Sequence, residues 1–338
     1  MKRSSLFLFC LALASGTTFS LAGANPTVRQ LTEWPNTDFE QHAIDYDEIM
    51  SGGPPKDGIP PLDAPVFERL IDGQATEWAN RLGDREPVIT VAVGQDVRAY
   101  PLSILTWHEI VNDTVGGIPL TITYCPLCNA ALVYQRTVDG TVLDFGTTGK
   151  LRHSDLVMYD RQSESWWQQF TGEAIVGTQT GTRLTLYPAR LESFALFKER
   201  HPDAQVMVPE DPSLRDYGRN PYPAYDAPGG TPFLYRGEMP EGIEPMARVV
   251  AVETAQGSQA WSLALLREKG RIASDGLLLS WTQGQASALD STTVSEGRDV
   301  GNVTVQRLVD EKVVDVPYDV TFAFAFHVFR PESPIHTQ

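Results

Sequence analysis

Alternating apolar and polar positions, separated by short turn sequences, dominate the middle of the chain. Val88–Val93 and Val97–Tyr100 flank Gly94–Asp96, a turn of the composition that β-hairpins favour. Apolar residues then recur at helical spacing from Pro101 to Val111, with proline at a first-turn position that tolerates it. Leu120–Tyr124 returns to the strand pattern. This region is therefore predicted to consist of antiparallel hairpins with short helices between them.

The flanking regions add shorter elements and a long connection. Val66–Asn80 has room for one or two short helices, and Leu191–His201 has the spacing of an amphipathic helix. Leu156–Tyr159 and Ser165–Phe170 have the pattern of two hairpin arms. Residues 209–245 are rich in proline and glycine, which predicts a long surface loop.

The pattern of the first half returns after this loop. Arg248–Thr254 and Gln259–Trp261 flank Gln256–Ser258, as in the earlier hairpin. Ser262–Gly270 then takes the place of the helix, and Gly276–Trp281 takes the place of the next strand. We interpret this as an internal duplication of a hairpin–helix–strand unit, although any β-rich chain can contain two such hairpins by chance.

The predicted fold class is therefore α+β and β-rich, with antiparallel hairpins, a few short helices and, on the duplication hypothesis, two halves that share one core. The predicted divisions of the chain follow the composition of each segment. They are a signal peptide at 1–24, an extended N-terminal arm at 25–65, a first half at 66–208, the loop at 209–245, and a second half, a degenerate repeat, at 246–338.

The first residues have the layout of a secretory signal peptide. Lys2 and Arg3 form a basic start, Leu6–Ala14 is a short apolar run, and Ala22–Ala24 offers a small-residue cleavage site. The apolar run is shorter than the roughly 20 residues that a membrane-spanning helix needs, and no later stretch is long and apolar enough. We therefore expect an exported protein, periplasmic or secreted, without membrane insertion.

The chain carries a formal net charge of −16, and removal of the basic N-terminal segment makes it more negative still. This charge argues against nucleic acid as a partner, because the phosphate backbone would repel it. The same charge can also serve solubility alone. A small molecule or another protein remains open as the partner, and nothing in the sequence selects between them.

One thiol pair would remain in the exported protein. Cys125 and Cys128 are separated by two residues in a predicted turn, while Cys10, the third cysteine, lies in the predicted signal peptide. A pair at this spacing can bind a soft metal ion such as copper or zinc, cycle between dithiol and disulfide, or close a structural disulfide. The second half has Thr282 and Gln285 at the corresponding positions, so we expect the chemistry in the first half.

A metal site needs more ligands than two thiolates, and histidine is the first candidate. His108 is preferred because it lies on the predicted helix directly before the cysteine strand. His153 is the second candidate, and Met158 is a further one for Cu(I). Arg152 and Asp155 fit either a pocket or a salt-bridged hairpin. The residues predicted to line a pocket are Glu109, Arg152, Asp155, Met158 and Trp167.

Two other interpretations use the same residues. His108, Glu109 and Asn112 match the helical zinc-protease motif except that asparagine replaces the second histidine, so we reject that motif. The spacing of Cys125 and Cys128 is also that of thioredoxin-like redox sites, but those sites open a helix, whereas a hairpin pattern follows here. A metal-binding protein is the leading hypothesis. A thiol–disulfide oxidoreductase and a ligand-binding protein with a structural disulfide are the alternatives, and whether the protein is an enzyme stays open.

Long motifs run through the chain at Trp107–Asp113, Thr123–Cys128, Ser154–Asp160, Thr171–Ile175, Phe322–Phe326 and Phe329–Pro331. Together they resemble the hallmark segments of a bacterial family, domain of unknown function 3179. The resemblance covers residues 57–335, nearly the whole exported chain, and it implies no particular activity. The function therefore has to be derived from the residues themselves.

Overall fold

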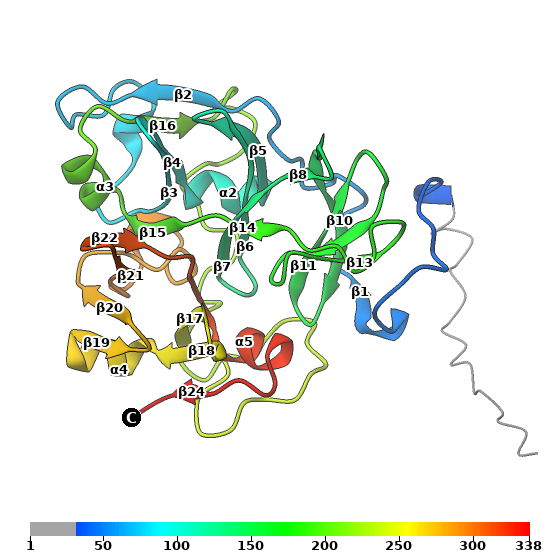
Figure 1. The fold of residues 1–338 in the computed structure, drawn as a ribbon. Helices are drawn as coiled ribbons and strands as arrows, with labels where there is room; N and C mark the ends of the chain where they lie inside the picture. The colour runs from blue at the N-terminus through cyan, green and yellow to red at the C-terminus, as the bar shows by residue number, and fades with distance from the viewer. Residues whose placement is uncertain (1–31) are drawn as a thin grey trace, which may run out of the picture.

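Antiparallel hairpins build most of the molecule (Figure 1). The computed structural model describes residues 32–338, so the predicted signal peptide and residues 25–31 lie outside the described part. The helices within the described residues are short, and most strand pairs are antiparallel, which confirms the predicted β-rich α+β class. No helix within residues 32–338 has the length and apolar character needed to cross a bilayer.

The first sheet of the first half has the strand order β15–β3–β4–β16–β2. β3 and β4 form the hairpin predicted around residues 94–96, and β16 lies parallel to β4. Residues 66–80 contain less helix than predicted, because Val66 pairs with Val208 across β2 and β16 and only the short 3-10 helix η2 lies at the end of this range. The elements are β2 (Val66–Arg69), η2 (Ala79–Arg81), β3 (Pro87–Val93), β4 (Asp96–Pro101), β15 (Ala189–Ser193), α3 (Phe194–Arg200) and β16 (Gln205–Val208).

The second sheet of the first half carries the cysteine turn. Its order is β14–β7–β6–β5, and β6 ends at Cys125. The helix predicted over residues 101–111 ends before Glu109, because that residue adopts φ 59° and Ile110 already pairs with Thr123. A β-branched residue such as Ile110 fits helical spacing and strand pairing alike, so periodicity overextended the helix. The elements are α2 (Leu102–His108), β5 (Ile110–Val115), β6 (Ile118–Cys125), β7 (Ala130–Gln135) and β14 (Thr185–Leu186).

A third sheet has the order β1–β10–β11–β12–β13. β11 and β12 form the predicted hairpin, in which Met158 pairs with Trp167. The register of β10 shifts between Thr147 and Lys150, and such a bulge bends the strand. The elements are η1 (Tyr46–Glu48), β1 (Ile49–Ser51), the small hairpin β8 (Thr137–Val138) and β9 (Thr141–Val142), β10 (Phe145–Arg152), β11 (Asp155–Asp160), β12 (Trp166–Gln168) and β13 (Glu173–Val176).

The N-terminal arm is anchored to this third sheet. Its strand β1 pairs with β10, and the amide of Gly52 donates to the carbonyl oxygen of Gly149 at 2.8 Å. A Cβ atom on Gly149 would lie 1.9 Å from the carbonyl oxygen of Pro54, and its φ is +70°, so the position requires glycine. Trp34 is buried against Trp166, with ring centroids 5.3 Å apart. The described part of the arm is thus held by packing as well as by hydrogen bonds.

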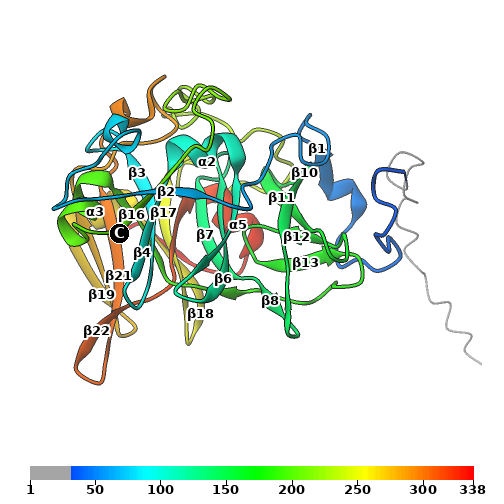
Figure 2. The same ribbon diagram turned by 90° about the horizontal axis from the view of Figure 1, so that it is seen from above.

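The second half forms two further sheets, with the orders β23–β17–β18–β24 and β19–β20–β21–β22. Figure 1 and Figure 2 both place β10, β11 and β13 on the opposite side of the molecule from β19 and β22. The elements are β17 (Arg248–Thr254), β18 (Gly257–Ser262), α4 (Leu263–Lys269), β19 (Arg271–Ser274), β20 (Leu277–Thr282), η3 (Val294–Glu296), β21 (Asn302–Val309), β22 (Lys312–Asp315), β23 (Asp319–Phe322), α5 (Ala323–Phe329) and β24 (Ile335–His336).

Both halves show the same order of strand pairing. The order β3–β4–α2–β5–β6–β7 in the first half corresponds to β17–β18–α4–β19–β20–β21 in the second. A parallel neighbour also completes each hairpin, β16 beside β4 and β24 beside β18. At the helix ends, the amide of Tyr124 donates to Glu109 O at 2.8 Å, and the amide of Trp281 donates to Gly270 O at 2.9 Å. The duplication hypothesis rests on these pairings.

One hydrophobic cluster runs through both halves. It contains Tyr124 and Leu127 from the cysteine turn, together with Phe322 and Phe324 from the second half. A backbone hydrogen bond joins the halves at the same place, because the amide of Phe322 donates to Cys128 O at 3.1 Å. The cysteine turn therefore lies at the junction of the two halves.

Residues 209–247, all of which the structure describes, contain no helix or strand. Tyrosines tie this long loop to the first half. The Tyr217 hydroxyl lies 2.8 Å from His108 Nε2, and the Tyr225 hydroxyl donates to Leu127 O at 3.0 Å. The loop thereby brings its side chains next to the cysteine turn.

Glu86, which directly precedes β3, gives a test of the burial in the first half. Its carboxyl group is buried, and Oε1 has no hydrogen-bond partner among the described residues. Burial raises the pKa of Glu86 to about 7. The folded state therefore favours the protonated carboxyl, and stability falls as the pH rises through about 7. We expect Glu86→Gln to stabilise the protein by about 1–3 kcal/mol at pH 8 and by much less at pH 5, measured by urea unfolding.

The exposed Glu241→Gln provides the control, and its unfolding free energy should match the wild type at both pH values. An equal effect of Glu86→Gln at pH 5 and pH 8 would contradict the burial of an uncompensated carboxyl group at this position.

Candidate metal centre

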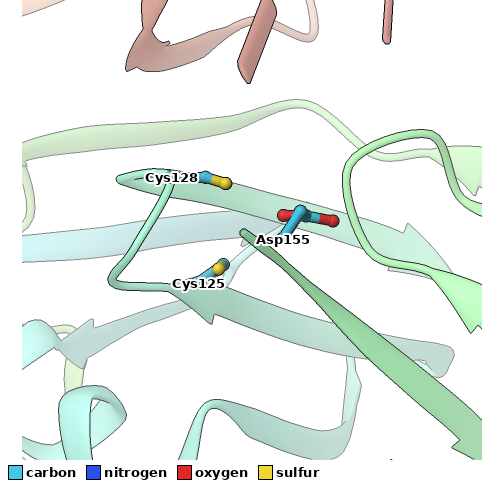
Figure 3. Close-up of side chains that lie close together, drawn as sticks. All are labelled: Cys125, Cys128 and Asp155. Carbon is cyan, nitrogen blue, oxygen red and sulfur yellow. The ribbon is translucent and has the colours of Figure 1, made fainter. Parts of the chain in front are cut away.

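Two hairpin turns from different sheets meet at the junction (Figure 3). The first turn, Cys125–Cys128, joins β6 to β7 and is followed by Asn129, which adopts φ 52°. The second joins β10 to β11 through His153 and Ser154, whose φ values of 51° and 71° are the positive pair that tight hairpin turns favour. Asp155 follows directly as the first residue of β11. The two turns thus bring together side chains that are far apart in the sequence.

Cys125, Cys128 and Asp155 form a compact group of possible ligand atoms. Their two Sγ atoms and one carboxylate oxygen all lie within 4.8 Å of one another, and all three side chains are buried. Figure 3 shows the three side chains gathered around one space between the turns. The two sulfur atoms do not form a disulfide. The group therefore offers two soft donors and one hard donor to a single ion.

Asp155 is held rigidly by one of its two oxygens. Its Oδ1 accepts hydrogen bonds from Gln168 Nε2 at 2.5 Å and from the amide of Phe170 at 2.9 Å. Its Oδ2 is buried and has no hydrogen-bond partner among the described residues. Burial raises the pKa of Asp155 to about 7, although these hydrogen bonds act in the opposite direction. One oxygen is thus fixed while the other is free to bind a ligand.

The two thiols are equally short of charged partners. Burial raises the pKa of Cys125, and it raises that of Cys128 well above the usual range. Apart from burial, Asp155 raises both values through its charge. In the absence of a cation the thiols are therefore protonated at neutral pH. A bound metal ion would replace those protons, because thiolates are the form that binds metals.

Glu109 stands beside this group with an unpaired carboxyl. Its side chain is 7% exposed, and it makes no hydrogen bond or ion pair with any described residue through its carboxyl group. Burial, followed by the charge of Asp155, raises the pKa of Glu109 to about 8. Glu109 and Leu127 of the cysteine turn line the same cavity, and the charge of Glu109 raises the pKa of Cys125.

A cavity of about 290 Å³ opens next to the group. Leu127 of the cysteine turn, Leu156 beside Asp155, and Glu109 form part of its wall. The remaining lining residues come from the N-terminal arm, β10 and the long loop: Gly52, Pro54, Ile59, Thr147, Gly149, Lys150, Leu151, Tyr222, Tyr225 and Phe233. The site thus combines a candidate metal centre with a mainly apolar chamber.

A larger cavity, of about 690 Å³, lies in the second half between α4 and the long loop. Its buried Asp226 forms ion pairs with Arg248 and Arg298 at 2.8 Å each. These charges are therefore satisfied within the protein. The lining of this cavity contains no cysteine or histidine. We therefore place the chemistry at the smaller cavity.

His108 does not join the thiol group. Its Nδ1 lies 2.8 Å from the carbonyl oxygen of Pro60, and its Nε2 lies 2.8 Å from the hydroxyl of Tyr217. Both ring nitrogens are thus engaged by the N-terminal arm and the long loop. The helix ends at this residue, and Glu109, not His108, lines the cavity. The prediction that His108 approaches the cysteines is therefore corrected by the structure.

His153 also lies away from the sulfur atoms, although it belongs to the neighbouring turn. Its Nε2 is 3.0 Å from Glu48 Oε2, and the same carboxylate pairs with Arg152 at 2.6 Å. His153 and Arg152 therefore both bind Glu48 of the N-terminal arm. Met158 and Trp167 are fully buried in the core, and Trp167 Nε1 donates to Asp160. Of the residues predicted to line a pocket, Glu109 lines the cavity and Asp155 lies beside the sulfur atoms.

Sequence patterns give little indication of two features of the site. They fit Asp155 to a pocket or a salt bridge and favour histidine as the ligand. Tyr222 and Tyr225 lie in a loop with no regular pattern, so periodicity does not mark them. The cluster of aromatic residues in a proline-rich loop was the available signal, since such a loop is otherwise polar.

Comparison with protein families found one that matches most of the chain. The family described as Protein of unknown function (DUF3179) matches residues 56–333. The chain therefore belongs to this family, and the predicted resemblance is confirmed. Comparison with curated proteins and with solved structures found no match.

The burial of the thiols predicts low reactivity in the folded protein. With metal removed by a chelator, we expect iodoacetamide to alkylate Cys125 and Cys128 at least tenfold more slowly than in guanidinium, because the reactive thiolate falls tenfold per pKa unit. Mass spectrometry over time would follow the reaction. Rapid native alkylation of both thiols would show that the turn is open to solvent.

Proposed function

We propose that this member of the DUF3179 family binds one soft metal ion, zinc or copper, through Cys125, Cys128 and Asp155. The observation that carries the proposal is the buried Oδ2 of Asp155. It has no hydrogen-bond partner among the described residues, and it belongs to a side chain grouped with both sulfur atoms. Native proteins rarely leave such an atom unsatisfied, and an ion bound between the turns would satisfy it.

The donor set suits zinc or copper better than a hard cation. Thiolates select zinc and Cu(I), whereas calcium and magnesium require oxygen ligands. Around tetrahedral zinc, ligand atoms at about 2.0–2.3 Å from the ion lie roughly 3.3–3.8 Å from one another, so atoms within 4.8 Å need only a contraction of about 1 Å. Three protein ligands leave one tetrahedral position, and an open position is typical of catalytic zinc sites. The site is therefore equipped to bind a further small ligand at the ion.

Thiol–disulfide exchange is the weaker alternative. Reactive cysteines are accessible and have a lowered pKa, often at a helix N-terminus. Here both thiols are buried, burial raises their pKa, and the turn joins two strands. The environment thus favours protonated or metal-bound sulfur over a nucleophilic thiolate.

We also propose that the protein acts outside the cytoplasm, in the periplasm or as a secreted protein. The basic, apolar and small-residue layout of residues 1–24 supports this, and those residues lie outside the described part. An oxidising compartment favours disulfide formation, so burial or metal binding would protect the thiol pair there. The negative charge of the chain supports the further proposal that nucleic acid is not a partner.

An internal duplication would explain why only one half carries this chemistry. The common order of strand pairing supports it, as do the equivalent hydrogen bonds at the two helix ends. β6 ends at Cys125, whereas β20 ends at Thr282. On this proposal, the second half has the same arrangement of strands and helix as the first half but has no cysteines at the corresponding turn. In a crystal structure, residues 248–290 should superpose on residues 87–132 with the same connectivity, and a different strand order would disprove the duplication.

Substitution of the three ligands tests the metal proposal. The purified protein without residues 1–24 should hold about one zinc or copper ion per chain, and Cys125→Ser should abolish this. Asp155→Asn should weaken the affinity by at least roughly 10–100-fold, the loss typical even of residues that support a ligand. Elemental analysis and competition with a chromophoric chelator provide the measurements.

Glu86→Gln is the matched control, because Glu86 is also buried, has a pKa raised to about 7, and has an Oε1 without a partner among the described residues. It should keep wild-type affinity, and so should His108→Ala. Stoichiometric metal in the double variant Cys125→Ser/Cys128→Ser would contradict the proposal. An effect of Glu86→Gln equal to that of Asp155→Asn would show that only stability had changed.

A further inference from the structure

We propose that the cavity beside the cysteine turn binds a primary alkylammonium ion, with Glu109 as its counter-charge and Tyr222 as a second acceptor. This inference goes beyond the metal proposal, because none of the residues that carry it is a metal ligand. It rests on an unpaired buried carboxyl, on the backbone that presents it, and on the composition of the cavity wall.

Glu109 occupies a backbone conformation that suits glycine. Its φ is 59° and its ψ −32°, directly after helix α2. Gly270 follows helix α4 in the second half with nearly the same angles, φ 71° and ψ −36°. Its carbonyl oxygen also accepts the equivalent hydrogen bond, from the second strand after the helix. A glutamate at such a position costs conformational energy that glycine would not, and strain of this kind is concentrated at functional sites. Because glycine would end the helix with less strain, the glutamate at this position indicates a functional role for its carboxyl group.

The carboxyl of Glu109 lines the cavity and lacks a counter-charge. No ion pair within residues 32–338 includes it. Lys150 also lines the cavity, but its ammonium group is engaged elsewhere, 3.9 Å from Glu33 and 5.4 Å from the centre of the Trp166 ring. A buried carboxylate without a cation is costly, and a cationic ligand would supply the missing charge.

Tyr222 adds an acceptor next to this carboxyl. Tyr222 lines the same cavity, and its hydroxyl has no hydrogen-bond partner among the described residues. Glu109 lines the same cavity, and its charge is, after burial, the next cause that raises the pKa of Tyr222. A primary ammonium group has three N–H donors, and two carboxylate oxygens with one phenol oxygen can accept all three.

The rest of the wall suits an alkyl chain. Leu127, Leu151 and Leu156 supply aliphatic surface, and the rings of Tyr225 and Phe233 complete the enclosure. Aromatic rings also attract cations through their electron-rich faces. The volume of about 290 Å³ is what roughly ten water molecules occupy in the liquid, so a small organic molecule fits.

Calorimetry with three probes of similar size tests the inference. The protein without residues 1–24, treated with chelator, would be titrated with n-butylammonium, n-butanol and butyrate at pH 9. This pH lies above the pKa of about 8 of Glu109 and below the pKa of about 10 of an alkylammonium group, so both are charged. We expect n-butylammonium to bind about tenfold or more tightly than the other two, because a charge-assisted hydrogen bond contributes at least that factor. Equal or tighter binding of butanol or butyrate, or no binding of n-butylammonium, would overturn the inference.

Two variants locate the binding at Glu109. Glu109→Gln should weaken n-butylammonium binding about tenfold or more. Glu109→Gly should do the same without lowering the melting temperature, because glycine relieves the positive φ. Glu86→Gln, which changes a buried glutamate that does not line this cavity, should bind as the wild type does. Unchanged affinity in Glu109→Gly would overturn the assignment even if Glu109→Gln failed to fold.

Zinc stoichiometry and n-butylammonium selectivity are measured separately, so the two proposals can fail independently. Selective n-butylammonium binding in chelator-treated protein supports the cavity inference, whatever the zinc stoichiometry proves to be. A protein that binds one zinc ion but shows no preference for n-butylammonium would retain the metal proposal and lose the cavity inference.

Discussion

Burial of acidic groups without a paired cation is the constraint on which this structure depends. Cys125, Cys128, Asp155 and Glu109 share one interior region, and none of the ion pairs within residues 32–338 includes any of them. Burying even one such group is costly unless it stays protonated or gains a partner. A fold that gathers four of them requires rigid support from every side. Much of the surrounding architecture supplies that support.

The second half of the chain provides much of this support. The amide of Phe322 and the hydroxyl of Thr321 both donate to Cys128 O, at 3.1 and 2.8 Å. Asn129, directly after the second cysteine, donates from its side chain to Val320 O. β23 therefore holds the cysteine turn in place while contributing no side chain to the group of donor atoms. The second half acts on the site as a scaffold, and in its own large cavity Asp226 is paired with Arg248 and Arg298.

Local patterns predicted the hairpins well because their turn residues are consecutive in the sequence. The helix at residues 101–111 was overextended because Ile110 suits both periodicities. Helical spacing places His108 near the cysteine strand but does not predict which groups its side chain contacts. For this reason it favours His108 as a ligand, although the arm and the long loop bind its ring. Asp155 reaches the sulfur atoms only because two sheets pack turn against turn. That contact joins positions about thirty residues apart, and no periodicity records it.

A single oxygen atom links two parts of the cavity wall. The Tyr225 hydroxyl donates to the carbonyl of Leu127, between the two cysteines, and accepts from the amide of Phe233 at 3.2 Å. One hydroxyl group therefore connects Phe233 of the long loop with the backbone segment that spaces the two sulfur atoms. The cavity wall and the spacing of the thiol pair thus share one hydrogen-bonded support.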